Sequence, residues 1–213
     1  MVKKLQIYLL GLFILSIGSN LFINAALGVS PSCSLALTLT YLLPGSYAFF
    51  NFIVNSFCLI LEAILIKSFG KTQFVQLGIT FIYSYLIKIT SIFLTQIQPH
   101  TIIEQILVAV IACFIMALGI ELTIDSNLTV MPYEGLVGAL SYKLKISFGK
   151  LKVIADIVFT LSSILLSLLL LHNLNSVGLG TIIASFLTGN IVSLYAHFLA
   201  KRITLYIAKP LSL

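Results

Sequence analysis

Charged residues are scarce in this sequence of 213 residues. Asp, Glu, Lys and Arg together make up 8% of it, whereas 60% is hydrophobic. A soluble globular domain carries about 25% charged residues, so this composition excludes a water-soluble protein. The formal net charge of +6 comes from Lys and Arg at the ends of apolar segments, where such residues anchor to lipid head groups. We therefore expect the lipid bilayer as a partner and no nucleic acid.

Residue patterns for enzyme chemistry are also missing. The sequence has no Ser/His/Asp set, no paired-His metal motif and no nucleophile elbow. Cys33, Cys58 and Cys113 lie within apolar stretches without CxxC or His-rich spacing. This pattern predicts small packing residues, and neither a disulfide framework nor a zinc site. We therefore expect no enzyme activity, no cofactor and no metal.

The sequence does contain an internal duplication. Residues 13–57 and 114–158 align without a gap at a constant offset of 101 residues. Membrane transport folds are often built from such repeats, with the binding site where the halves meet. A one-residue insertion then aligns Leu77-Gly78 with Leu179-Gly180. Identical residues fix the register: Phe13/Phe114, Gly18/Gly119, Leu21/Leu122, Ile23/Ile124, Leu27/Leu128, Val29/Val130 and Pro31/Pro132.

Apolar stretches divide the chain into six long segments and two short ones. A helix needs about 20 apolar residues to cross a bilayer, and residues 31–43 and 132–144 are too short for this. Both begin with Pro, which suits the first position of a helix because its missing N–H would have no partner there. We therefore predict two re-entrant or discontinuous half-helices. The predicted spans are 5–26, 47–66, 74–96, 103–125, 152–171 and 179–200.

The basic residues favour six crossings over eight. Cytoplasmic loops carry an excess of Lys and Arg, and residues 97–103 and 172–178 carry neither. Six crossings place all basic groups and both termini on the cytoplasmic side. Three crossings per repeat then make the second repeat enter the membrane upside down. The basic groups are Lys3/Lys4, Lys67/Lys71, Lys143/Lys145/Lys150/Lys152 and Lys201/Arg202/Lys209.

The predicted fold class is therefore all-α. We expect a polytopic membrane helix bundle that forms a single domain over residues 1–213. It consists of two inverted repeats, about 5–96 and about 103–200, and each repeat has three spans and one short Pro-initiated half-helix.

Several short motifs resemble a known family. Leu27-Gly28-Val29-Ser30-Pro31 resembles the LG-x-SP segment of the YczE/YyaS/YitT-like family of bacterial integral membrane proteins, and residues 178–181 resemble its GLGT segment. Residues 132–136, 147–150 and Asp156 are similar to its second half. Ser32-Cys33 stand where that family has an aromatic and an acidic residue, so no polar role carries over there.

The resemblance covers essentially the whole chain. It implies a multi-pass protein of the bacterial cell (plasma) membrane. Some members are associated with regulation or with secondary-metabolite production. The family supplies no established substrate or catalytic residue.

Acidic residues inside predicted spans are candidates for a binding site, because a charge near the centre of a spanning helix costs about 2.5–3.5 kcal/mol on insertion scales. Glu121 and Asp125, four residues apart, share a helix face. Beside a cavity, two close carboxylates would suit proton or cation binding. Alternatively, Asp125 lies in water at the end of its helix and only Glu121 is buried. Their counterparts Asn20 and Asn24 either join this site or hydrogen-bond helices to each other.

The two half-helices add further candidates. Glu134 lies in the first turn of the second half-helix, where it either complements the helix dipole or joins Glu121 around a cation. Ser30 precedes the first half-helix, whose free N–H groups suit an anion.

Other charges and small residues have simpler interpretations. Lys152 and Asp156 are four residues apart, and a structural ion pair is the leading interpretation. Asp156 stays a site candidate because its counterpart Asn55 is also polar. Lys88 either reaches an interface or pairs with an acid such as Glu62. Close helix approach is expected at Gly78, Gly178, Gly180 and Gly189.

These features support two functions. One is a small-solute or ion transporter with a central site between inverted repeats; Glu121→Gln or Asp156→Asn would then abolish transport. The other is a membrane sensor, regulatory or accessory subunit that acts through protein partners. The repeat, the half-helices and the buried acids favour transport, and the near absence of soluble loops counts against the second function. The substrate, the direction, the coupling ion and a homo-oligomeric state are left open.

Overall fold

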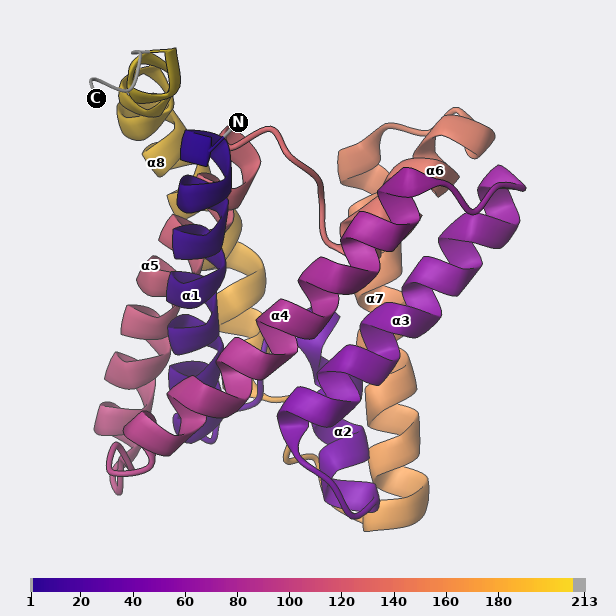
Figure 1. The fold of residues 1–213 in the computed structure, drawn as a ribbon. Helices are drawn as coiled ribbons and strands as arrows, with labels where there is room; N and C mark the ends of the chain where they lie inside the picture. Colours follow the sequence, from indigo (N-terminus) through magenta and orange to yellow (C-terminus); the bar gives the residue numbers. More distant parts are fainter. Residues whose placement is uncertain (1, 209–213) are drawn as a thin grey trace.

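The computed structural model describes residues 2–208, and describes side chains for residues 2–199 and Ile203. This part of the chain contains eight α-helices and no strand, which confirms the predicted all-α fold (Figure 1). A short π-helix, Ser167–Leu171, directly follows the seventh α-helix. The helices are α1 Val2–Asn24, α2 Pro31–Leu42, α3 Tyr47–Ile66, α4 Lys71–Leu94, α5 Ile102–Asp125, α6 Pro132–Leu144, α7 Phe148–Leu166 and α8 Leu179–Ala208.

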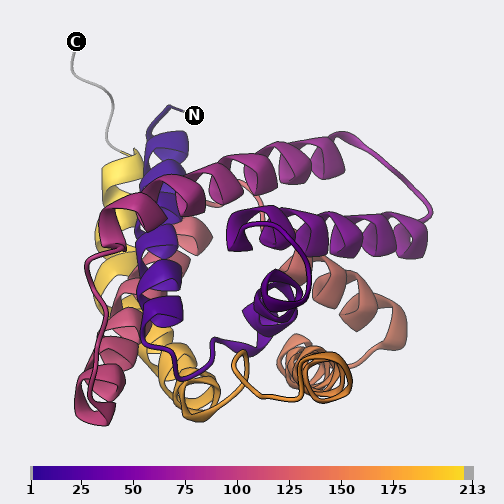
Figure 2. The ribbon, with the colours of Figure 1, turned by 90° about the horizontal axis from the view of Figure 1, so that it is seen from below.

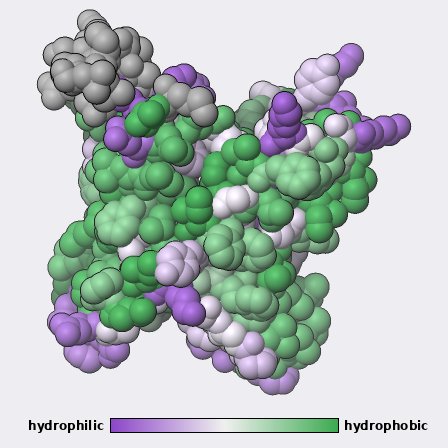
Figure 3. Space-filling view, in the orientation of Figure 1, coloured by the Kyte–Doolittle hydropathy of each residue, from purple (hydrophilic) through white to green (hydrophobic). Residues whose placement is uncertain are grey.

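Six of these helices are long and apolar enough to cross a membrane. They are α1, α3, α4, α5, α7 with its π-helical end, and α8. The side chains on the outside of α7 are apolar and exposed, for example Ile157, Leu161 and Leu165. On the face shown in Figure 3, hydrophobic residues cover most of the middle and hydrophilic residues gather at the two ends. The chain is therefore a multi-pass membrane protein.

The first helices of the two repeats, α1 and α5, pack tightly against each other. Glycine makes this possible: a Cβ on Gly119 would lie 2.6 Å from the backbone nitrogen of Leu15, and one on Gly18 would lie 2.5 Å from Cγ of Met116. Residues near the start of α1 face residues near the end of α5, so the two helices run in opposite directions. Figure 1 shows this antiparallel pair.

The two short helices begin at the predicted prolines, Pro31 and Pro132. They start inside the bundle and run toward opposite ends of it, α2 alongside α7 and α6 alongside α3 (Figure 1). Seen from below, α2 lies end-on near the centre, with α1, α5 and α8 on one side and α3, α6 and α7 on the other (Figure 2). Both short helices therefore begin in the interior, although Leu128 and Val130 in the connection before α6 are exposed.

The helix ends that carry basic residues lie together. The start of α1, the α3–α4 connection, the α6–α7 connection and the end of α8 are all at the top of Figure 1, and residues 95–101 and 172–178 are at the bottom. Lys209 lies outside the described residues, as do the side chains of Lys201 and Arg202. This arrangement is what the six-crossing topology requires. The inverted relation of the repeats and the side that faces the cytoplasm remain predictions.

Some predictions for individual residues need correction. Gly178 and Gly180 lie against the backbone of Leu27, as expected, but nothing lies within 4 Å of a Cβ built on Gly78 or Gly189. These two glycines do not serve close packing, because their helix faces are open. Lys88 is exposed on α4.

We expect Lys71→Cys and His100→Cys to react with a membrane-impermeant thiol reagent from opposite sides of the membrane. Lys71 is exposed at the start of α4, and His100 is exposed in the connection before α5, at the opposite end of the bundle. Native cysteines give little background, because Cys58 and Cys113 are buried and Cys33 is half-buried. Labelling would be measured in sealed, right-side-out vesicles before and after permeabilisation. Reaction of both cysteines from the same side would overturn the six-crossing topology.

Candidate functional site

The first break in the helical chain, residues 25–30, is held by a segment of the second repeat. Gly180 N–H donates to the carbonyl of Leu27 at 2.7 Å, and Val29 N–H donates to the carbonyl of Ser176 at 3.2 Å. Backbone polar groups in an apolar interior need such partners. The left-handed backbone at Gly28, with φ of +86°, turns the chain into α2.

Small residues allow these two segments to touch. A Cβ on Gly180 would lie 2.7 Å from the Gly28 carbonyl oxygen, and one on Gly178 would lie 2.8 Å from the Leu27 carbonyl oxygen. The LG-x-SP-like and GLGT-like motifs therefore contact each other directly, although about 150 residues separate them in the chain.

Hydroxyl groups fix α2 against α7 and the residues that follow it. The Ser163 hydroxyl donates to the Ser34 hydroxyl at 2.8 Å, and the hydroxyls of Thr38 and Ser176 share a bond of 2.5 Å. All four side chains are buried. These bonds fix the position of α2 in the bundle, and therefore the positions of Ser30 and Pro31 at its start.

The second break, residues 126–131, leads into α6. There the Tyr133 hydroxyl donates to Oδ1 of Asp156 at 2.5 Å. The Lys152 ammonium lies 3.4 Å from the same oxygen and 4.8 Å from the centre of the Tyr133 ring. The predicted pair of Lys152 and Asp156 is therefore present, and Tyr133 is a partner that the sequence did not reveal.

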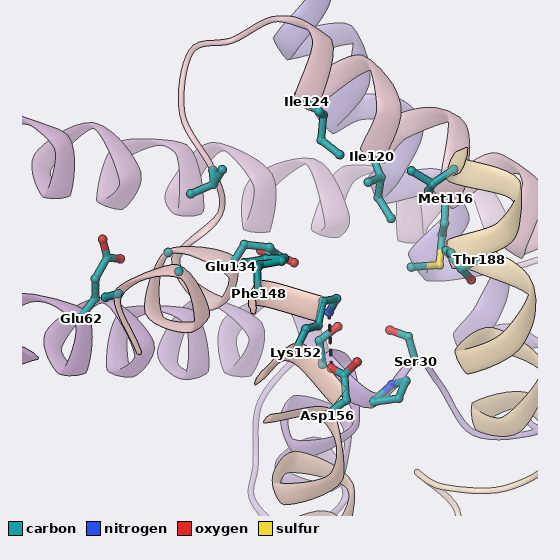
Figure 4. A pocket seen from close by; sticks show the side chains of 18 of the residues that line it. Ser30, Glu62, Met116, Ile120, Ile124, Glu134, Phe148, Lys152, Asp156 and Thr188 are labelled. Atoms are coloured by element: carbon teal, nitrogen blue, oxygen red, sulfur yellow. Dashed lines mark hydrogen bonds and ion pairs between the residues drawn. The ribbon is translucent and has the colours of Figure 1, made fainter. Parts of the chain in front are cut away.

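A cavity of about 740 Å³ lies between the two breaks. Figure 4 shows Glu134 and Lys152 on one side of it, Met116 and Thr188 on the other, and Ser30 and Asp156 below. The starts of both short helices reach its wall. The lining is mostly apolar and includes four charged side chains. Its polar lining includes Ser30, Glu62, Gln76, Glu134, Lys152 and Asp156.

Glu134 has the most central position. It lines this cavity, a second one of about 380 Å³ beside Tyr8 and Thr123, and a third of about 90 Å³ beside Asn51 and Asn55. Its carboxylate lies in the first turn of α6, where it complements the positive end of the helix dipole. The position of Glu134 is therefore compatible with both predicted roles, complementing the helix dipole and binding a ligand, because it lies in the first turn of α6 and also lines a cavity.

The other predicted site residues divide into two groups. Asn55 lines the smallest of these cavities and donates to the backbone oxygen of Asn51 at 3.0 Å. Asn20 donates from α1 to the carbonyl of Ile87 at 2.9 Å, and Asn24 donates to that of Leu94 at 2.8 Å. These two asparagines therefore join α1 to α4, as the alternative interpretation expected.

Glu121 and Asp125 lie at the end of α5 and are not part of the 740 Å³ lining. Glu121 is buried, and Asp125 is half-buried with Oδ2 fully covered. Asp125 is the last residue of α5 and is partly exposed, so of the two acids only Glu121 is fully buried. The structure brings Ser30, Glu134 and Asp156 around one cavity, and separates Glu121 from them.

Glu62 and Gln76 are lining residues that the sequence did not identify as a site. Glu62 is 5% exposed and Gln76 is 1% exposed. Gln73 Nε2 donates to Glu62 Oε1 at 3.5 Å, so Glu62 has an amide partner, and of the two alternatives for Lys88 the ion pair with Glu62 is not formed. The signal in the sequence was the spacing of Gln73 and Gln76, which puts two amides on one face of an apolar helix.

Comparison with known families gives one match. The description of that family is "Family of unknown function (DUF6198)", and the match covers residues 2–197. No curated protein and no solved structure matches the chain. The resemblance to the YczE/YyaS/YitT-like family, and the bacterial origin that it implies, stay expectations.

We expect Gly180→Val to lower the free energy of unfolding by about 1–3 kcal/mol, because overpacking at a tight contact costs this much. The new side chain would meet backbone atoms of residues 27 and 28, which have little room to move. Gly189→Val in the same helix is the matched control, since space there is open. Thermal unfolding of purified protein in detergent measures both. Equal midpoints for the two variants would contradict the assigned contact.

Proposed function

We propose that this chain, which belongs to the DUF6198 family of unknown function, is a membrane transport protein for a small polar or charged solute or ion. The observation that carries the proposal is the cavity of about 740 Å³ between the starts of the two short helices. It contains charged side chains in a chain that has few of them.

The cost of these charges supports a role beyond packing. Ionisable residues inside membrane-spanning bundles are expensive, and they commonly mark substrate or ion pathways. Lys152 and Asp156 partly compensate each other. Glu134 forms no ion pair with any described side chain, so it offers a negative charge to a ligand in the cavity.

The two helix starts differ in the charge that they offer. The first turn of α2 has no acidic residue, and the Ser30 side chain caps no backbone N–H, so the positive end of this helix suits an anionic group. The first turn of α6 carries Glu134, which suits a cationic group. A solute with one group of each sign would use both.

The arrangement also suits alternating access. Each repeat contributes one interior helix start, and these helices run to opposite ends of the bundle. In transporters built from inverted repeats, movement of one half against the other opens the central site to each side in turn. We propose this mechanism here, with both termini in the cytoplasm and the chain in the cell membrane. We propose no enzymatic step.

The test begins with a thermal-shift screen of purified protein against metabolites and ions, since a ligand of the folded state raises its stability. Uptake of the ligand found would then be measured in proteoliposomes. We expect Glu134→Gln and Asp156→Asn to raise the apparent Kd or KM about 10- to 100-fold, because a hydrogen bond to a charged group contributes about 1.5–3 kcal/mol. Glu104→Gln is the control, because Glu104 is exposed and only caps α5.

The variant Glu121→Gln distinguishes the site predicted from the sequence from the site at the 740 Å³ cavity. Loss of uptake in Glu121→Gln with normal uptake in Glu134→Gln would show that the 740 Å³ cavity is not the transport site. Ligand binding without uptake would favour the alternative function, a membrane sensor or accessory subunit.

A further inference from the structure

Glu62 is a buried acid without a basic partner among the described side chains. It lies near the end of α3, is 5% exposed and lines the central cavity. Its Oε1 accepts from Gln73 at 3.5 Å, and its Oε2 lies near Gln76 Nε2 without forming a hydrogen bond of normal geometry. No described Lys, Arg or His forms an ion pair with it. The carboxylate therefore has a fully covered oxygen and no compensating charge.

A second unpartnered oxygen belongs to the same cavity wall. Gln76 follows Gln73 by three residues on α4, is 1% exposed, and its Oε1 has no hydrogen-bond partner. Its Nε2 and Oε2 of Glu62 both lie against Gly135 on α6, where an added Cβ would be 2.6 Å and 2.3 Å from them. The missing side chain at Gly135 thus makes room for these two polar groups.

The groups around Glu62 and Gln76 provide oxygen acceptors but no positive charge. Buried polar groups are normally hydrogen-bonded, and buried charges are paired or coordinate a metal. Here two oxygens that accept, one from a carboxylate and one from an amide, are left over in an apolar bundle. Carboxylate and amide oxygens are ligands for hard cations. One carboxylate is neutralised by one monovalent cation.

We propose that Glu62 Oε2 and Gln76 Oε1 bind a monovalent metal cation, with the Gln76 amide rotated so that Oε1 rather than Nε2 faces Glu62, and with sodium as the ion to test first. Glu62 and Gln76 line the same cavity as Glu134, but Figure 4 shows the start of α6 between Glu62 and Glu134. Glu134 and Gly135 are consecutive residues of α6, however. An ion at Glu62 therefore stabilises the helix turn that positions Glu134, and this coupling role rests on the proposed transport function.

Ion binding itself is tested on the full-length protein without any solute. Thermal unfolding in detergent would be compared in NaCl, KCl and choline chloride at equal concentration. We expect the midpoint in sodium to exceed that in choline by roughly 5–10 °C once sodium reaches about 100 times its Kd. Glu62→Gln should abolish this difference, because the amide cannot neutralise a cation.

A second variant leaves the carboxylate in place. Gly135→Ala would push a methyl group against Glu62 Oε2 and Gln76 Nε2, and should also reduce the sodium effect. Glu104→Gln, the same change at an exposed position, and Glu134→Gln, the same change at the solute site, should both retain it.

Equal midpoints in all three salts would overturn the proposal, as would a sodium effect that persists in Glu62→Gln. A sodium effect that is lost in Glu134→Gln and kept in Glu62→Gln would assign the ion to the solute site, and also overturns it. Failure of the uptake experiment alongside a sodium effect that depends on Glu62 would remove the transport function and leave the ion site standing.

Discussion

Where a helix ends inside an apolar bundle, its free backbone N–H and C=O groups need hydrogen-bond partners there. This requirement determines how the two repeats contact each other. Residues 27–29 form hydrogen bonds with residues 176–180 across the interior. That contact fixes where α2 begins, and α2 in turn forms one wall of the central cavity. A glycine at each closest approach keeps the two backbones within hydrogen-bonding distance, because any side chain would separate them.

The two halves of the molecule have different chemistry at matching positions. Asn20 and Asn24 bind α1 to α4 by ordinary hydrogen bonds, whereas their counterparts Glu121 and Asp125 are acids at the end of α5. Charge is concentrated instead on α6 and α7, where Glu134, Lys152 and Asp156 line one space. Both repeats therefore contribute helices to the cavity wall, and three of its four charged side chains come from the second repeat.

Much of the fold was predictable because its signals are local. Apolar length gave the six spans, and Pro31 and Pro132 marked the first residues of the short helices. The Lys152–Asp156 pair followed from spacing on one helix. The rotation of each helix about its axis was not predictable, since it depends on neighbours distant in sequence. For this reason Glu121 turned out to lie away from the cavity, while Glu62 and Gln76 proved to line it.

The bond between Leu27 and Gly180 has a consequence for biosynthesis. Residues 27–29 enter the membrane early, yet their partners at 176–180 are made only after most of the chain has left the ribosome. Until then the first break has no permanent partner for its backbone. The N-terminal half therefore completes its folding only after the C-terminal half has been made. A chain that stops before residue 176 lacks the hydrogen-bond partners of residues 27 and 29.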